Sequence, residues 1–192
     1  MSDAAPVVLP DCLDAGADLA LDNPFWSFAC LIYAQDAVAP ACLELQDDFG
    51  VQVNALLFML WLGTRGHSPG EAGYRTLLDF LAPWTGGVVQ PLRQARRNWK
   101  LLGGRSPAVQ AGREALKRSE LFAEQIACAY LFRLAERGHD AAPHATPERA
   151  VTANLDLVLR LAGLPAARRQ ELAPRLAGAA HAVAAKCPGP AA

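Results

Sequence analysis

The sequence predicts an all-α protein, a single-domain helical bundle of about seven helices. Three observations predict this class. Asn-Pro, Ser-Pro and Thr-Pro pairs recur along the chain, and a capping residue followed by proline is typical of a helix start. Apolar residues between these pairs are spaced three and four apart, as on one face of a helix. No sustained segment alternates apolar and polar residues as a half-buried strand does.

The first two predicted helices lie within residues 24–49. The first begins at Pro24, where the missing N–H of proline is harmless, with Asn23 or Asp22 as its cap. The second takes Asp36 as its cap and ends at Gly50, a residue suited to the left-handed conformation that closes many helices.

The third predicted helix covers residues 52–64 and carries the most apolar run of the chain. The fourth begins in the segment 68–71, which has the pattern of a capping box. Ser68 is the predicted cap, and Glu71 follows three residues later to complete the box. This helix is expected to end near Pro83.

The fifth and sixth predicted helices cover residues 88–102 and 107–137. Glycine pairs at 86–87 and 103–104 are expected to bound the fifth helix, because glycine favours helix ends. A break is expected in the sixth helix near Ser119. The seventh helix begins at Thr146-Pro147 and runs to Gly163.

These elements predict one folded unit with two tails. Residues 1–20 are expected to be a disordered lead-in, residues 21–164 the helical bundle domain, and residues 165–192 an Ala-, Arg- and Pro-rich tail that is partly helical. Pro174 is expected to interrupt the tail and keep its helices short.

Charge is distributed unevenly along the chain. The first 64 residues carry nine acidic side chains and no basic one, whereas residues 65–118 carry ten basic and three acidic side chains. Such asymmetry indicates either a charged partner or attraction between the two parts.

Several functional classes lack support in the sequence. The longest apolar run is far shorter than the roughly 20 residues of a membrane helix, and no basic residue precedes Arg65, so neither a membrane segment nor a signal peptide is expected. Five scattered cysteines favour free thiols in the cytoplasm. We find no catalytic motif, metal-ligand spacing or cofactor fingerprint, so no metal or cofactor is expected, while enzymatic activity remains open.

Two segments resemble a known family. The first, NPFWSFACLIYAQDAVAPACLELQDDFGVQVNALLFMLWLG, carries the Asn-Pro-Phe-Trp, Leu-Gln, Val-Asn and Leu-Leu-Phe elements of a bacterial family known only as a domain of unknown function. The second, residues 88–100, is similar to another block of that family. The resemblance spans about residues 20–135 and implies a helical cytosolic protein without implying a reaction. Gln52 stands where an acidic residue is expected.

The first candidate site is a basic face on the fifth helix. Arg93, Arg96, Arg97 and Lys100 are spaced so that they share one side of the helix, away from its apolar stripe. Three interpretations stay open: a solvated face partly neutralised by acidic residues of the first two helices, a surface for an acidic protein partner, and a surface for nucleic acid.

The second candidate site is a pocket between the first and third helices. Its predicted residues are polar or aromatic: Asn23, Trp26, Tyr33, Gln46, Asn54 and Trp61. Each also has a purely structural interpretation. Asn23 can cap a helix, Trp61 shares a face with Leu57 and Phe58, and the Asn54 amide can be satisfied by groups of the protein itself.

The sequence therefore favours a non-enzymatic interaction or regulatory module that uses the basic face. A small-molecule binder or enzyme that uses the pocket, and a protein associated with RNA or DNA, are the two alternatives.

Overall fold

The computed structural model describes residues 18–102, 106–137 and 145–186. Within these ranges all regular secondary structure is helical, which confirms the predicted all-α class. The elements are α1 (Pro24–Tyr33), α2 (Val38–Phe49), α3 (Val53–Thr64), α4 (Gly70–Trp84), the π-helical turn η1 (Thr85–Val89), α5 (Gln90–Leu102), α6 (Pro107–Arg137), α7 (Pro147–Leu161) and α8 (Ala166–Ala184).

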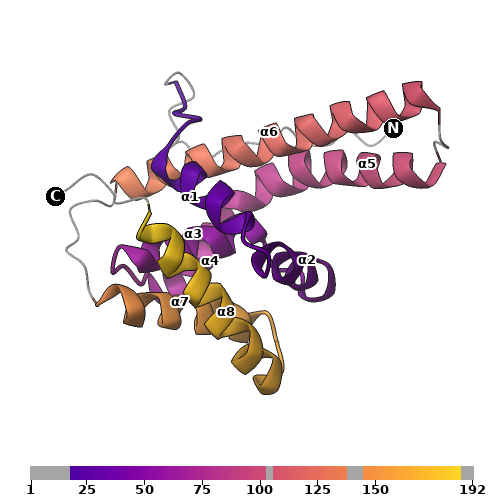
Figure 1. Cartoon of the computed structure of the whole chain (residues 1–192). Coiled ribbons are helices and arrows are strands. Elements are labelled where there is room, and N and C mark those ends of the chain that lie inside the picture. The colour runs from indigo at the N-terminus through magenta and orange to yellow at the C-terminus, as the bar shows by residue number, and fades with distance from the viewer. Residues whose placement is uncertain (1–17, 103–105, 138–144, 187–192) are drawn as a thin grey trace.

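Helix α3 is the centre of the core, as its apolar sequence leads one to expect. It packs against α1, α2, α4, α6, α7 and α8, which surround it in the body of the molecule (Figure 1). An aromatic cluster joins α1 to α3, since the Phe25 ring lies 5.1 Å from the Phe58 ring and 5.5 Å from the Trp61 ring between centroids. Burying these rings is the main source of stability for such a contact.

Several helix ends follow the sequence signals. The Asn23 side chain accepts a hydrogen bond of 2.8 Å from the Trp26 N–H, and Thr146 caps α7 by accepting from the Arg149 N–H. Gly50 ends α2 with φ of 66°, a left-handed value that glycine adopts without strain. These three predictions are confirmed.

Two predicted caps are wrong. Asp36 does not cap α2, because a turn closed by the Val38 N–H donating to the Gln35 carbonyl leads directly into the helix and leaves Ala37 at the cap position. Ser68 does not form a capping box. Its hydroxyl instead donates to Asn154 Oδ1 at 2.7 Å, and this contact joins the entry of α4 to α7.

Three predicted interruptions are also wrong. The segment with Gly86 and Gly87 continues from α4 through η1 into α5, and α6 is unbroken at Ser119, whose hydroxyl donates to the Ala115 carbonyl. Helix α8 passes through Pro174 as one helix with four buried apolar residues, Leu172, Leu176, Ala180 and Val183. Packing against neighbouring helices outweighs local propensity at these points.

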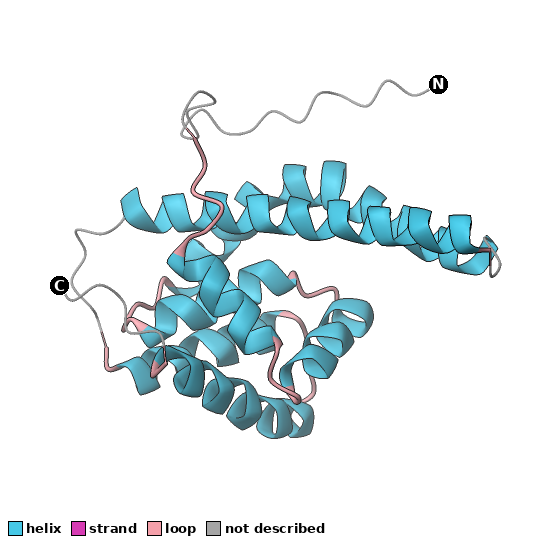
Figure 2. Cartoon of the chain, turned by 45° about the horizontal axis from the view of Figure 1, so that its top comes forward, coloured by secondary structure: helices cyan, strands magenta, loops and turns pink. Residues whose placement is uncertain are grey.

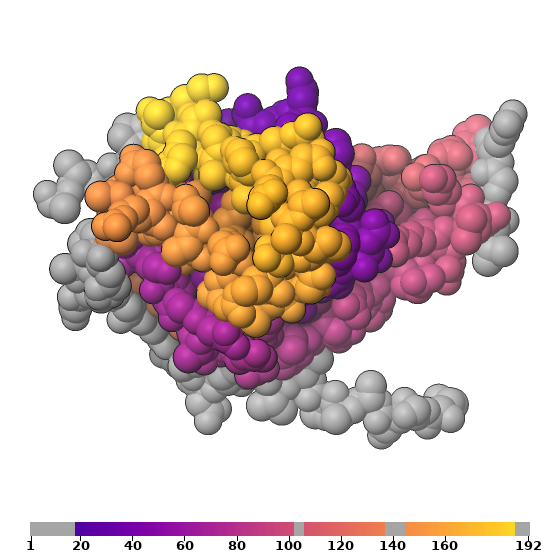
Figure 3. Space-filling model, turned by 90° about the horizontal axis from the view of Figure 1, so that it is seen from below, coloured from indigo at the N-terminus to yellow at the C-terminus, as the bar shows by residue number. Residues whose placement is uncertain are grey.

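Helices α5 and α6 form a long hairpin that crosses one side of the body and projects beyond it (Figures 1 and 2). The inner part of α6 packs against α1 and α3, and the Trp84 Nε1–H donates to the Ala123 carbonyl at 2.9 Å. Seen from below, α7 and α8 form the near surface, and the hairpin extends to one side (Figure 3).

No single described helix is long and apolar enough to cross a membrane. Among the described helices, α1 and α2 taken together meet the length and composition for a span, but they are bent by 96° relative to each other.

Candidate functional site

A groove of about 520 Å³ lies where the hairpin meets the body of the protein. Its apolar lining comes from four different helices, with Trp26 and Tyr33 on α1, Leu43 on α2, Leu57 on α3 and Leu121 on α6. Its charged lining comes from the hairpin alone: Arg93, Arg96 and Arg97 on α5, and Lys117, Glu120 and Glu124 on α6. The groove therefore combines an apolar surface with a charged one.

The two sites predicted separately from the sequence converge in this groove. Four of the predicted pocket residues line it (Trp26, Tyr33, Gln46 and Asn54), together with three of the predicted basic residues (Arg93, Arg96 and Arg97). Helix α6 packs against α1 and pairs with α5 in the hairpin, and Arg97 of α5 contacts Asp47 of α2. This arrangement places the arginines beside the aromatic residues of α1.

Three predicted site residues lie outside the groove. Asn23 is buried and caps α1, while its Nδ2 donates to the Ala20 carbonyl at 2.8 Å. Trp61 is 4% exposed and packs in the aromatic cluster of the core. Lys100 is exposed on the outer part of α5. Asn23 and Trp61 thus have the structural interpretation that the sequence also allowed.

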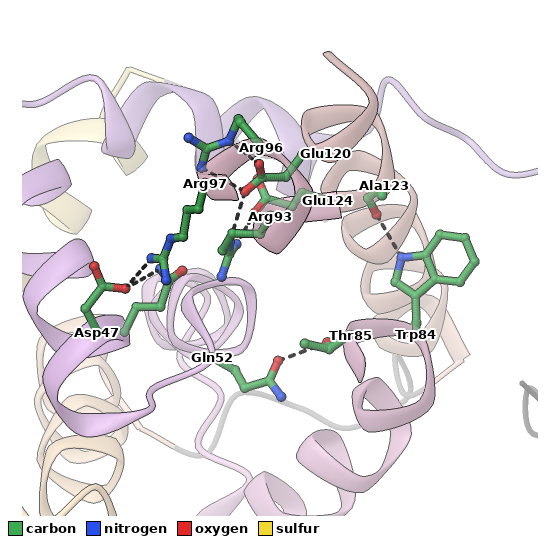
Figure 4. A network of polar contacts seen from close by, with 11 residues as sticks. Asp47, Gln52, Trp84, Thr85, Arg93, Arg96, Arg97, Glu120, Ala123 and Glu124 are labelled. Carbon is green, nitrogen blue, oxygen red and sulfur yellow. Dashed lines mark hydrogen bonds and ion pairs between the residues drawn. The ribbon is translucent and has the colours of Figure 1, made fainter. Parts of the chain in front are cut away.

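The basic face of α5 is not an open row of cations (Figure 4). Arg93 donates through Nε to Glu120 at 2.9 Å and through a terminal nitrogen to Glu124 at 2.6 Å. Arg96 Nε donates to the other oxygen of Glu120 at 2.5 Å. Arg93 and Arg96 are therefore only partly exposed, because the carboxylates of α6 hold them between the two helices.

The two glutamates of this network have pKa values shifted in opposite directions. Burial by itself would raise the pKa of Glu120, but hydrogen bonds from Arg96 and Arg93 outweigh it and hold this pKa below its usual range. Burial dominates at Glu124 and raises the pKa of that carboxyl, with Arg93 offsetting it only in part. Glu120 is thus the anion that holds the arginines, and Glu124 is the group that takes up a proton first as pH falls.

Arg97 has a different environment from Arg93 and Arg96. It donates to Asp47 of α2 at 2.8 Å, and both side chains are about half exposed. An exposed pair of this kind contributes at most about 1 kcal/mol, so its partners exchange easily for other charged groups. Lys117 is exposed and forms no ion pair with any described residue. Arg97 and Lys117 are therefore the cations of the groove that a ligand can reach.

Uncharged polar groups complete the lining. Within the described residues the Asn54 side chain makes no hydrogen bond, which leaves its amide available in the groove rather than satisfied by protein groups. Gln46 donates to Asp47 at 3.0 Å and also lines the groove. Together they offer acceptors and donors beside the cations.

Cys30 lies at the surface of the groove, whereas Cys42 and Cys128 are buried as core residues. Burial raises the pKa of the Cys30 thiol, so the thiol remains protonated at neutral pH and is not an activated nucleophile. Among the described residues no group of three or more His, Cys, Asp or Glu is placed to hold a metal ion.

Sequence reasoning did not single out several residues that line the groove, among them Leu43, Glu120, Leu121 and Glu124. One signal was present, since Glu120 and Glu124 are four residues apart and share a face of α6. In the hairpin these two glutamates face Arg93 and Arg96 of α5. The spacing of the glutamates could not be interpreted from the sequence, because it does not show that α5 and α6 pack together.

A further hollow of about 500 Å³ adjoins the groove along α2, η1 and α5. It shares Gln46, Arg93 and Arg97 with the groove, so the two hollows are neighbours. Gln52, beyond this hollow, accepts a hydrogen bond of 3.0 Å from the Thr85 hydroxyl and holds the start of α3 to the π-helical turn (Figure 4).

A family model described as a protein of unknown function (DUF2390) matches residues 24–131, which is more than half of the chain. The matched segment includes α1 to α5 and most of α6, and therefore every residue that lines the groove. Helices α7 and α8 lie outside it. No curated protein and no solved structure matches the chain.

Proposed function

The chain belongs to the DUF2390 family of proteins of unknown function, and we propose that it acts as a non-enzymatic interaction module in the cytoplasm. The groove binds a segment of a partner protein that is amphipathic, with apolar residues on one face and acidic residues beside them. The observation that carries the proposal is the meeting of exposed apolar side chains and reachable cations in one groove.

The apolar part of the groove is suited to a protein segment. Tyr33, Leu43 and Leu121 are 37%, 49% and 52% exposed, although such large apolar side chains are usually buried. An amphipathic helix commonly binds by laying its apolar face in a groove of this kind. The adjoining hollow shares Arg93 and Arg97 with the groove, and two neighbouring hollows favour an extended segment over a compact small molecule.

The charged part selects an acidic segment. A partner carboxylate replaces Asp47 at Arg97 at little cost, because the original pair is half exposed. A second carboxylate reaches Lys117 on the neighbouring helix. Arg93 and Arg96 do not take part directly, since Glu120 and Glu124 already engage them, and they hold the hairpin against itself so that the groove keeps its shape.

The ion pairs of the α5 arginines make nucleic acid a less suitable ligand than an acidic protein segment. A phosphate backbone is bound by a row of free cations that release counterions. Of the four predicted basic residues, Arg93, Arg96 and Arg97 already contact carboxylates of the protein, and only Lys100 forms no ion pair with a described residue.

Photo-cross-linking in the native host tests the proposal. A photoreactive phenylalanine analogue replaces Leu43 in the groove, and a control protein carries it at Thr152, which is exposed on α7. We expect a partner cross-linked from position 43 and not from position 152, through a segment that mass spectrometry identifies as apolar and acidic. Arg97→Gln with Lys117→Gln should reduce the yield several-fold, and the reduction should shrink at high salt.

Equal cross-linking from both positions would contradict the proposal, and so would a cross-linked segment that is basic. Capture of RNA, or loss of the cross-link after RNase treatment, would instead support the nucleic-acid alternative.

A further inference from the structure

A second cavity lies in another part of the molecule and shares no lining residue with the groove. It has a volume of about 270 Å³ and is formed by the end of α3, the start of α4 and the end of α6. Its walls are mostly apolar, with Phe58, Met59 and Trp61 from α3, Leu77 from α4 and Leu134 from α6. An apolar cavity of this size has room for a molecule roughly twice the size of benzene.

One cation stands in the lining of this cavity without a counter-ion. The Arg65 guanidinium lies over the Trp61 ring, 4.8 Å from its centroid. Within the described residues its side chain has no carboxylate within ion-pair distance and no hydrogen bond. Stacking on an aromatic ring fixes the plane of a guanidinium while leaving the N–H groups at its edge free to bind an anion.

The turn that carries Arg65 is held in place by hydrogen bonds to α7. The buried Asn154 side chain of α7 donates to the carbonyls of Met59 and His67, each at 2.9 Å, and accepts from the Ser68 hydroxyl. These contacts fix the turn between α3 and α4 on both sides of the arginine. The site is therefore preorganised, which lowers the cost of binding.

We propose that this cavity binds a small carboxylate with an apolar body. The apolar body occupies the space between Phe58, Leu77 and Leu134, and the carboxylate accepts hydrogen bonds from Arg65. The planar guanidinium donates two parallel hydrogen bonds to a carboxylate, so the acid is selected over an uncharged compound of the same shape.

Titration calorimetry on the full chain with 4-phenylbutyrate and 4-phenylbutan-1-ol tests this proposal. The two probes share one apolar body and differ in the carboxylate. We expect the acid to bind at least about tenfold more tightly than the alcohol, as a charge-assisted hydrogen bond predicts. Arg65→Met keeps the apolar stem of the side chain and should bring the two affinities together. The matched control is Arg75→Met, which removes an exposed arginine of α4 paired with Glu71 and should leave the preference unchanged.

Two further variants keep the proposal falsifiable. Arg65→Lys retains the charge but loses the planar guanidinium. Its preference for the acid over the alcohol should be weaker than that of the wild type, and this result does not require Arg65→Met to fold. Leu134→Phe narrows the cavity and should weaken binding of both probes. The proposal is overturned if the wild type binds neither probe or binds both equally, or if binding is unchanged in Leu134→Phe.

Discussion

Replacing Glu120 by glutamine is the sharpest test of how the hairpin is held together. Glu120 is 7% exposed, and its two oxygens accept from Arg93 at 2.9 Å and from Arg96 at 2.5 Å. Glutamine has nearly the same shape and keeps one oxygen acceptor, so the change removes the charge while disturbing packing little. It leaves two arginines beside a neutral amide.

The expected cost follows from burial. Removing one partner of a buried ion pair costs about 3–5 kcal/mol, because the other charge stays buried without compensation. The Arg93 and Arg96 side chains remain 19% and 27% accessible to water, and Arg93 keeps Glu124, so the lower end of that range applies. We expect Glu120→Gln to lower the free energy of unfolding by about 3 kcal/mol, which corresponds to about 6–12 °C in Tm for a chain of this size.

Urea denaturation across a pH series measures this cost. The pKa of Glu120 is lowered in the folded protein, so its contribution to stability is present above the unfolded pKa, about 4.3, and is lost as pH falls through the folded pKa. The difference in the free energy of unfolding between wild type and Glu120→Gln should therefore be largest at neutral pH, and it should disappear as the pH falls below about 4. Asp47→Asn, which breaks a half-exposed pair, should cost no more than about 1 kcal/mol. Equal costs for the two variants would refute the assignment of Glu120 as the central anion.

Three other variants test the core. Trp61→Ala should lower the free energy of unfolding by about 3–5 kcal/mol, because Trp61 is 4% exposed within the aromatic cluster, and an unchanged denaturation midpoint would contradict this placement. Asn154→Ala should cost about 3 kcal/mol by removing the buried hydrogen bonds from Asn154 to the Met59 and His67 carbonyls, and a loss below about 1 kcal/mol would show that water replaces the amide. Pro174→Ala should raise the free energy of unfolding by up to about 3 kcal/mol, since it restores a helical N–H in α8, and no gain in thermal denaturation would indicate that the helix already accommodates the ring.

Local signals identified the helices and many of their ends. Asn23 before Pro24 and Thr146 before Pro147 predicted two starts correctly, because a cap is satisfied within three residues of its own position. The apolar density of α3 likewise predicted that this helix is central. Such features depend only on neighbours in the sequence.

Features that depend on distant residues could not be predicted. Glycines at 86–87 suggest a break, but Trp84 donates to Ala123 and Val89 is buried, so tertiary contacts carry the helix through a π-helical turn. Ser68 looks like a cap until Asn154, 86 residues away, is placed beside it. Tertiary packing decides both cases.

The candidate site illustrates the same division. The residue types were recognisable, since Trp26, Tyr33, Asn54 and the arginines of α5 were all singled out from the sequence. Their convergence could not be recognised, because it requires α5 and α6 to pair as a hairpin whose inner part packs against α1. The structure shows that Arg93 and Arg96 form ion pairs with Glu120 and Glu124. Only these contacts distinguish the arginines that hold the hairpin from the cations that a ligand can reach.

A matched pair of leucine and phenylalanine variants tests the proposed groove most directly. Leu121 and Phe122 are neighbours on α6 and are equally exposed at 52%, yet of the two only Leu121 lines the groove. Leu121→Ser and Phe122→Ser therefore remove similar apolar areas from the surface of the same helix. The measurement is the yield of partner cross-linked through position 43 in each variant. The account predicts a several-fold loss for Leu121→Ser and a yield near that of the wild type for Phe122→Ser, whereas equal yields in the two variants, or a greater loss for Phe122→Ser, would contradict it.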